Sequence, residues 1–185
     1  MSKPEPTVAE IETEIVEMLR AEELSSLATI DADGFPSSAR MHLAGDGLLV
    51  YMHTFKNTRK HVHIQHNPNV GYDIAHLPPD GFYGRFTTRS LQVQGTATVV
   101  TDMDEIQHAS KISLNQFPWA ADTSLFNNIK PPDQGMQVFY RIQPVRGMWA
   151  DARVSLAYRA LLEFSEDGKS IAQVSNYKPA TAPPS

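Results

Sequence analysis

The first apolar positions along the chain recur at helical spacing. Between Thr7 and Glu22 they fall three, four, three and one residue apart, at Val8, Ile11, Ile15, Met18 and Leu19. This spacing predicts an amphipathic helix with one face turned toward a core. Thr7 is a suitable N-cap, and Glu10, three residues later, completes a capping box.

Downstream of this helix, short apolar stretches alternate with turn signals, which is typical of strands. Strands are expected over 24–30, 37–43, 48–54 and 70–77. Gly34 and the stretch 45–47 supply tight turns, so the second and third strands are expected to form a hairpin. A short polar helix over 56–66 ends before Pro68. Strands joined by tight turns pair antiparallel, because a parallel pair needs a long crossover.

The second half of the chain continues this pattern. We expect a long strand over 85–101, a helix over 102–117, an irregular stretch over 118–134, a strand over 136–149, and a strand or helix over 153–164. Gly95 inside the long strand marks a bulge or a sharp bend. Antiparallel strands interrupted by a few helices predict a mainly β fold, a closed or partly split barrel with helices packed outside.

Composition narrows the class of protein. We expect one domain over 7–175, between a disordered lead-in at 1–6 and a disordered Pro-rich tail at 176–185. The 185 residues carry a net charge of −5 and 41 % hydrophobic side chains, enough for a core but unlike a nucleic-acid binder. The absence of cysteine excludes disulfides and thiol nucleophiles. Without a secretory signal or a membrane-length apolar run, we expect a soluble cytoplasmic protein.

Cations gather in one segment of this acidic chain. The stretch 40–60 contains Arg40, Lys56, Arg59 and Lys60 but a single acid, Asp46. Thr58, Arg59 and Lys60 stand at the start of the expected helix, where free backbone N–H groups and the helix dipole attract anions. Arg matches a phosphate bidentately and Lys adds a point charge, so the pattern indicates a phosphate site. The alternative is a solvated helix face, although cations there oppose the dipole.

Histidines suggest a second kind of site. His61 and His63 on one helix point about 160° apart and cannot share a metal ion, so solvated histidines are the favoured interpretation and no metal is assigned. His53, beside the phosphate segment, is either functional or an ordinary groove-lining residue. Hydrolase, Walker and dinucleotide-binding motifs are absent.

Six short pieces occur in a fixed order along the first half of the chain. They are Leu27-Ala28-Thr29, Asp33-Gly34 with Pro36, Arg40, His53-Thr54, Thr58-Arg59-Lys60 and Asn67-Pro68. Over roughly residues 8–150 this order resembles the pyridoxamine 5'-phosphate oxidase-like family. The resemblance implies an antiparallel, FMN-binding split β-barrel that forms homodimers with FMN at their interface. It also implies an oxidoreductase that transfers hydride between the flavin and a small organic substrate.

The same resemblance assigns cofactor-binding roles residue by residue. Arg40, Arg59 and Lys60 match phosphate-binding cations, and Thr54 and Thr58 match hydroxyls near the phosphate. Met41, His42 and Leu43 match the backbone beside the isoalloxazine ring. The remaining matches are His53, where the family often has Tyr, Ser90, where true oxidases have a flavin-contacting Gln, and Trp149, at an aromatic position that lines the site from the other subunit.

Two departures from the family pattern concern the substrate. The Lys that follows the strand Arg in true oxidases is missing from 42–47, and their R-L-H-x-R signature is absent after Trp149. Both departures argue against pyridoxamine phosphate as the substrate. Some relatives bind a deazaflavin coenzyme or haem in place of FMN. A deazaflavin-dependent reductase and a non-catalytic flavin- or haem-binding protein are therefore the alternatives, and no catalytic residue is assigned.

Overall fold

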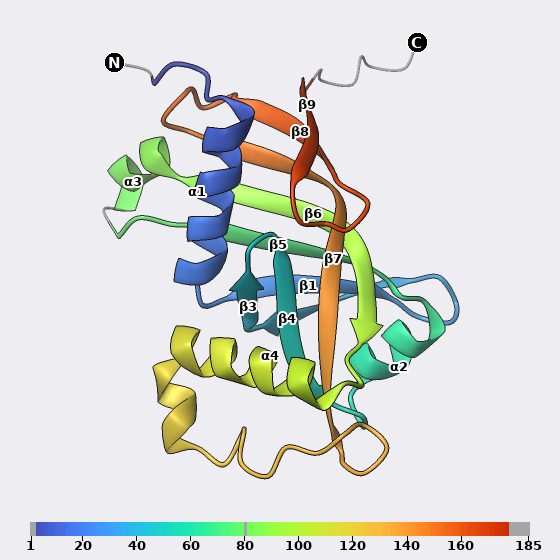
Figure 1. The fold of residues 1–185 in the computed structure, drawn as a ribbon. Coiled ribbons are helices and arrows are strands. Elements are labelled where there is room, and N and C mark those ends of the chain that lie inside the picture. The colour runs from blue at the N-terminus through green and yellow to red at the C-terminus, as the bar shows by residue number, and fades with distance from the viewer. Residues whose placement is uncertain (1–2, 80, 178–185) are drawn as a thin grey trace.

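The computed structural model describes residues 3–79 and 81–177. Nine strands form one antiparallel sheet in the order β2-β1-β5-β6-β7-β4-β3, and β8 and β9 extend it beside β7 (Figure 1). The strands are β1 Ser25–Ile30, β2 Pro36–Met41, β3 Leu43–Asp46, β4 Leu49–Phe55, β5 Asn69–His76, β6 Arg89–Val99, β7 Gln137–Asp151, β8 Arg159–Phe164 and β9 Ile171–Asn176. The helices are α1 Val8–Ala21, α2 Arg59–His66, α3 Gly81–Gly84 and α4 Met103–Gln116, with 3₁₀ turns η1 Arg85–Thr87 and η2 Pro118–Asp122.

The long strand β7 gives the sheet its curl into a half-barrel. One edge of β7 pairs with β6, while the other edge pairs first with β4 and then with β8. The β6–β7 register shifts between Gln94 and Gly95, which confirms the predicted bulge. A Cβ at Gly95 would lie 2.3 Å from the backbone oxygen of Gln143, so only glycine fits this crossing.

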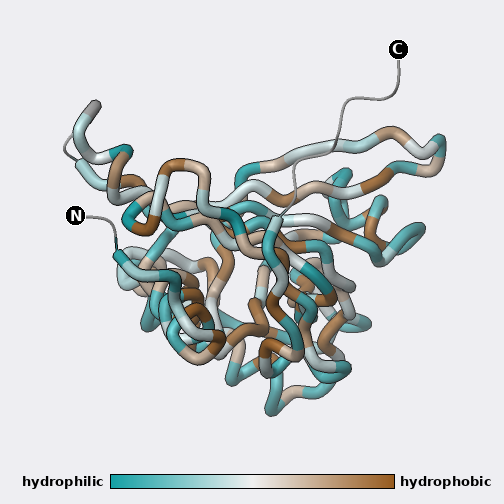
Figure 2. Tube along the Cα trace, turned by 90° about the horizontal axis from the view of Figure 1, so that it is seen from above, coloured by the Kyte–Doolittle hydropathy of each residue, from teal (hydrophilic) through white to brown (hydrophobic). Residues whose placement is uncertain are grey.

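Helix α1 packs on the inner face of the curled sheet, in one cluster with Val50 and Met52 of β4, whereas α4 packs on the outer face, in a cluster with Tyr51 of β4 and Phe139 of β7. The apolar face of α1, with Ile11, Ile15 and Met18, is buried in the main core. The predicted capping box is confirmed, because Thr7 and Glu10 each bond the other's backbone N–H. In Figure 2 the apolar segments concentrate within the body and the turns at its rim are hydrophilic.

One glutamine joins α4 to the end of α1. The Gln116 side-chain nitrogen donates to the carbonyls of Leu19 at 2.9 Å and Glu22 at 3.0 Å, and its oxygen accepts from the Gly45 N–H at 3.0 Å. A Cβ at Gly45 would lie 2.8 Å from the Leu19 oxygen, so β3 approaches α1 very closely. This junction fixes where α4 ends and where the following turn begins.

The predicted hairpin between 37–43 and 48–54 is wrong. The chain leaves the sheet at His42, and the new strand β3 makes the hairpin with β4, while β2 pairs with β1. The reason is the turn: Gly47 has φ +63°, so the reversal lies at 47–48 and Asp46 pairs with Leu49. Residues 153–164 form a turn followed by β8, and β9 was not expected.

The chain ends are partly described. Residues 1–2 and 178–185, which were expected to be disordered, lie outside the described residues. Within the expected lead-in, the Lys3 N–H donates to the Arg153 carbonyl at 2.9 Å. At the other end β9 extends to Asn176, the first residue of the expected tail. No helix in the described part of the chain is both long and apolar enough to cross a membrane.

Candidate functional site

Four residues of the predicted site line one small pocket. Arg40, Met41, His42 and His53 meet in a cavity of about 110 Å³. The opposite wall comes from α4 and the segment after it, with Ser113, Phe117, Trp119, Ala120, Leu125 and Phe126. Strand pairing brings the histidines together: Leu43 pairs with Met52, so His42, just before β3, and His53, on β4, lie next to that pair.

His42 lies against two aromatic rings of the far wall. Its ring centroid is 5.2 Å from that of Phe117 and 5.1 Å from that of Trp119. Its Nδ1 is buried and has no hydrogen-bond partner. The Glu23 carboxylate is 3.7 Å from this nitrogen, beyond hydrogen-bond reach, and instead accepts from the Trp119 Nε1 at 2.7 Å.

His53 is enclosed by phenylalanines. The rings of Phe55, Phe126 and Phe139 lie 5.2 to 5.4 Å from its own. Its Nε2 is buried without a partner. Burial lowers the pKa of His53 to about 4, because an apolar surrounding disfavours the imidazolium. The imidazole is therefore neutral at neutral pH and offers one donor and one acceptor.

The start of α2 is the other part of the predicted site. Thr58 caps this helix, donates to the Phe55 carbonyl at 2.8 Å, and lies 3.2 Å from the Thr54 hydroxyl. Arg59 and Lys60 follow, and the first turn contains no acidic residue. Within the described residues, no carboxylate is in ion-pair range of Arg40, Arg59 or Lys60. All three cations are thus available to an anion.

The structure divides the predicted site in two. Neighbouring strand residues point to opposite faces, so His53 faces α4 while Thr54, which is 4 % exposed, faces the barrel interior and Thr58. The pocket consequently contains Arg40 and His53 but neither Thr54 nor the α2 cations. Sequence reasoning placed these groups together because it took β2 and β4 for hairpin partners.

Three predicted residues lie away from the pocket. Leu43 is 1 % exposed in the main core. Trp149 is 0 % exposed in the same core, so its side chain has no surface to offer a ligand groove. Ser90 lies on β6 between Ala75 and Ala150 and does not line the pocket.

Two of the three α2 histidines, His61 and His63, have hydrogen-bond partners on the sheet, whereas His66 is exposed. His61 Nδ1 lies 2.8 Å from the Tyr140 hydroxyl, and His63 Nδ1 lies 3.0 Å from the Thr29 hydroxyl. They are therefore bonded across to β7 and β1, where solvation had been expected. Residues 3–79 and 81–177 contain no cluster of three side chains suited to hold a metal.

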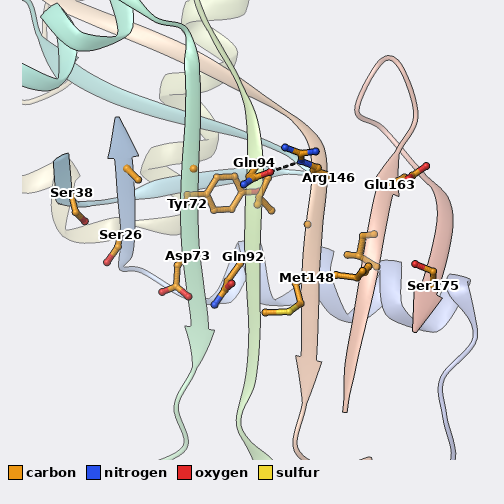
Figure 3. A pocket seen from close by; sticks show the side chains of 16 residues that line it. Ser26, Ser38, Tyr72, Asp73, Gln92, Gln94, Arg146, Met148, Glu163 and Ser175 are labelled. Carbon is orange, nitrogen blue, oxygen red and sulfur yellow. Dashed lines mark hydrogen bonds between the residues drawn. The ribbon is translucent and has the colours of Figure 1, made fainter. Parts of the chain in front are cut away.

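A larger hollow on the outer face of the curled sheet was not predicted from the sequence. It has a volume of about 650 Å³ and extends over β1, β5, β6, β7 and β8 (Figure 3). Its lining includes Asp73, Gln92, Arg146, Met148 and Glu163, and the Arg146 guanidinium donates to Gln94. No sequence signal marks it, since its polar residues alternate along strands like any solvent-facing set.

Comparison with known proteins decides the family. The sequence profile described as Pyridoxamine 5'-phosphate oxidase matches residues 11–147, most of the chain. The chain belongs to this family. The half-barrel is accordingly the pyridoxamine 5'-phosphate oxidase split barrel, as the sequence resemblance implied. No protein of curated function matches the sequence.

Solved structures share the split-barrel fold at low identity. The protein Rv2991 from Mycobacterium tuberculosis is 22 % identical with a TM-score of 0.62, over 83 % of this chain and 92 % of that one. A haem-binding protein from Mycobacterium smegmatis is 14 % identical with a TM-score of 0.62, over 84 % and 62 %. A protein described as an F420 reductase is 22 % identical with a TM-score of 0.50, over 71 % and 93 %.

In this member of the pyridoxamine 5'-phosphate oxidase family, the residues fit the phosphate group of a flavin better than they fit its ring system. Arg59 and Lys60 lack carboxylate partners and stand at a helix start, which fits a phosphate. The pocket beside His53, at about 110 Å³, is smaller than the roughly 300–1,000 Å³ of typical ligand sites. One chain therefore has cations at a helix start and a separate small pocket, and this pocket cannot enclose a ring system of flavin size.

Proposed function

We propose that the protein is a cytoplasmic FMN-binding oxidoreductase that transfers hydride between the flavin and a small organic substrate. Family membership supports a cofactor of the flavin type. One observation in the structure carries the proposal: Arg59 and Lys60, which have no ion-pair partner among residues 3–79 and 81–177, begin α2 without any acidic residue in its first turn. Cations at a helix start oppose the dipole, so this arrangement is best explained by a bound anion.

In this proposal, different residues bind the phosphate and the ring of the cofactor. Arg59 and Lys60 neutralise the phosphate, and the Thr58 cap orders the turn that presents them. The backbone of residues 41–43 forms the wall beside the ring. Phe126 and Trp119 shield the same pocket from water. The flavin supplies the hydride chemistry when bound, which agrees with the lack of an evident acid–base pair in the pocket.

A second copy of the chain completes the site in this proposal. The pocket at His53 is too small to enclose a flavin, whereas the outer hollow of about 650 Å³ leaves a broad sheet face uncovered. The hollow contains the basic residue Arg146 and the acidic residues Asp73 and Glu163. Two copies of this surface related by a two-fold axis can therefore place opposite charges against each other. We therefore propose a homodimer built on this face.

The alternatives are a deazaflavin-dependent reductase and a non-catalytic flavin- or haem-binding protein on the same fold. Solved structures that share the fold include a protein described as an F420 reductase and a haem-binding protein. The pocket beside His42 and His53, at about 110 Å³, is too small to enclose any of these ring systems within one chain, so the structure favours none of them over FMN.

The test is a titration of the protein with FMN, a deazaflavin coenzyme and haem, followed by absorbance and fluorescence. The double variant Arg59→Ala/Lys60→Ala is expected to bind FMN at least about 100-fold more weakly, since each charge-assisted contact contributes roughly 1.5–3 kcal/mol. The matched control Arg20→Ala/Lys111→Ala removes two exposed cations from α1 and α4 and should bind FMN normally. Unchanged FMN affinity in the first variant would refute the phosphate site, and haem uptake alone would favour the non-catalytic haem-binding protein.

A further inference from the structure

Two polar atoms in the small pocket have no hydrogen-bond partner. They are His42 Nδ1 and His53 Nε2, on side chains that face the same cavity. Buried polar side-chain atoms in folded proteins are paired in the large majority of cases. Two such nitrogens in one pocket therefore indicate that the pocket is built for a polar group that the described part of the chain does not supply.

The volume of the pocket limits the size of that ligand. The cavity measures about 110 Å³. An engineered cavity of about 150 Å³ in another protein accommodates benzene. The pocket is smaller than that cavity but is bordered by the exposed Arg40 and Trp119, so at most a single six-membered ring fits, with its substituents outside the enclosed volume. The three fused rings of a flavin are too large.

The walls select for an aromatic ring. Phe117, Trp119 and Phe126 line the cavity, and the histidine rings add two further flat faces. Aromatic rings in contact prefer edge-to-face or offset arrangements, which add attraction beyond the burial of apolar area. A saturated ring of the same size lacks this contribution.

The remaining polar group is a cation. Arg40 lines the pocket, its side chain is exposed, and no carboxylate in the described part of the chain pairs with it. A guanidinium binds a carboxylate with two parallel hydrogen bonds. The side chain that holds the anion is therefore already present beside the ring-binding walls.

We propose that this pocket binds a monocyclic aromatic or heteroaromatic carboxylate, with the carboxylate on Arg40, the ring between the aromatic walls, and a ring substituent on His42 or His53. The inference rests on the proposed function for its role, since such a compound would be the small organic substrate. The binding itself does not require a flavin. His53 suits this task because, as a neutral imidazole, it presents a donor and an acceptor without a charge to desolvate.

The experiment titrates the flavin-free protein with benzoate, the 3- and 4-hydroxybenzoates, and cyclohexanecarboxylate, followed by calorimetry and ligand-detected NMR. Benzoate is expected to bind with a Kd on the order of 1 mM or tighter, within the bounds for a ligand of its size. Cyclohexanecarboxylate should bind at least about tenfold more weakly. Equal binding of the two, or no binding of any aromatic acid, would overturn the proposal.

Substitutions test which residue contacts the carboxylate and which contacts the ring substituent. Arg40→Gln should weaken benzoate about tenfold or more, whereas Arg20→Gln, an exposed arginine on α1, should leave it unchanged. His53→Phe keeps the ring among its phenylalanines and should erase any preference for a hydroxybenzoate over benzoate. An unchanged benzoate Kd in folded Arg40→Gln contradicts the carboxylate site. Arg59→Ala/Lys60→Ala should retain benzoate while losing FMN, so failure of the flavin site is distinguishable from failure of this pocket.

Discussion

His53 shows how much one residue depends on segments far from it. Its place on β4 next to Thr54 follows from the sequence, but its surroundings do not. Phe126 reaches it from the stretch after α4, and Phe139 from β7. Three aromatic neighbours remove water from the imidazole, and the pKa falls to about 4. A histidine that looks like a titratable site residue is therefore an uncharged one.

This burial predicts a pH-dependent stability. An unfolded histidine has a pKa near 6.5, so between about pH 6.5 and 4 the unfolded chain binds a proton that folded His53 does not. Its contribution to stability falls through that window by up to about 3 kcal/mol. The variant His53→Phe should lack this loss, as measured by urea unfolding at pH 7.0 and 4.5. If the unfolding free energy of the two proteins changed by the same amount between pH 7.0 and 4.5, the pKa of His53 would not be lowered by folding.

Other site residues show what the sequence can and cannot establish. Arg40 and His53 were placed at one site from their order along the chain, and they do line one pocket. Trp119 and Phe126 were missed, since they come from a stretch without periodicity and meet the site only through the tertiary fold. The sequence resemblance places Trp149 in the ligand groove of the partner subunit. In a strand, a shift of one residue moves a side chain to the opposite face, and the sequence does not fix that shift. In the structure, Trp149 lies in the core.

At the scale of elements, α1 is held to the sheet by an ion network as well as by its apolar face. Glu14 pairs with Arg89 on β6, with Arg153 after β7 at 2.8 Å, and with Lys3 at 3.3 Å. Arg153 also bonds the buried carboxylate of Asp151 at both oxygens. Burial raises the pKa of Glu14, but hydrogen bonds from Arg153 and Arg89 outweigh it and lower the pKa to about 2.

Removing this carboxylate should loosen α1 in a pH-dependent way. Because the folded pKa lies below the usual 4.5, the stabilisation is present above about pH 4.5 and is lost as the pH falls toward 2. Glu14→Gln is expected to cost about 3 kcal/mol of unfolding free energy at pH 7 and little at pH 2 to 2.5. Glu17→Gln, on the exposed face of the same helix, is the control. A constant cost across pH would exclude the ion network as the source.

Elements with local signals were predicted well, and those defined by distant pairing were not. The α1 cap and the Gly95 bulge each follow from a few adjacent residues, and both are confirmed. The separation of β3 from β2 depends on the close approach of Gly45 to α1, a contact about 25 residues apart in sequence. No local pattern reports such a contact, so the sequence predicts a turn over 45–47 where the structure has the end of β3.

At the scale of the whole molecule, the uncovered sheet face distinguishes a lone chain from an assembly. The outer hollow lies on the outer face of the curled sheet, over strands that α4 does not cover, and has both acidic and basic residues (Figure 3). A second copy related by a two-fold axis would cover this face and bring another wall toward the flavin. The proposed dimer and the proposed cofactor site therefore depend on each other.

Sedimentation or light scattering tests this dependence. The wild-type protein is expected at twice the 20.6-kDa chain mass. Met148→Glu adds a third negative charge beside Asp73 and Glu163, so the dimer should dissociate at least about tenfold more readily and FMN affinity should fall with it. Lys111→Glu, at an exposed position on α4 outside the hollow, makes a larger change in charge but should leave both properties intact. A monomeric wild-type protein with full FMN affinity would contradict the proposed assembly.

The two tryptophans of the chain lie in contrasting environments, which has a practical consequence. Trp149 is 0 % exposed in the core, and Trp119 is 43 % exposed at the edge of the histidine pocket. Their emission should differ in wavelength and in accessibility to a soluble quencher. The protein thus carries two intrinsic optical reporters, one for the integrity of the barrel and one for occupancy of the pocket, and no label has to be introduced.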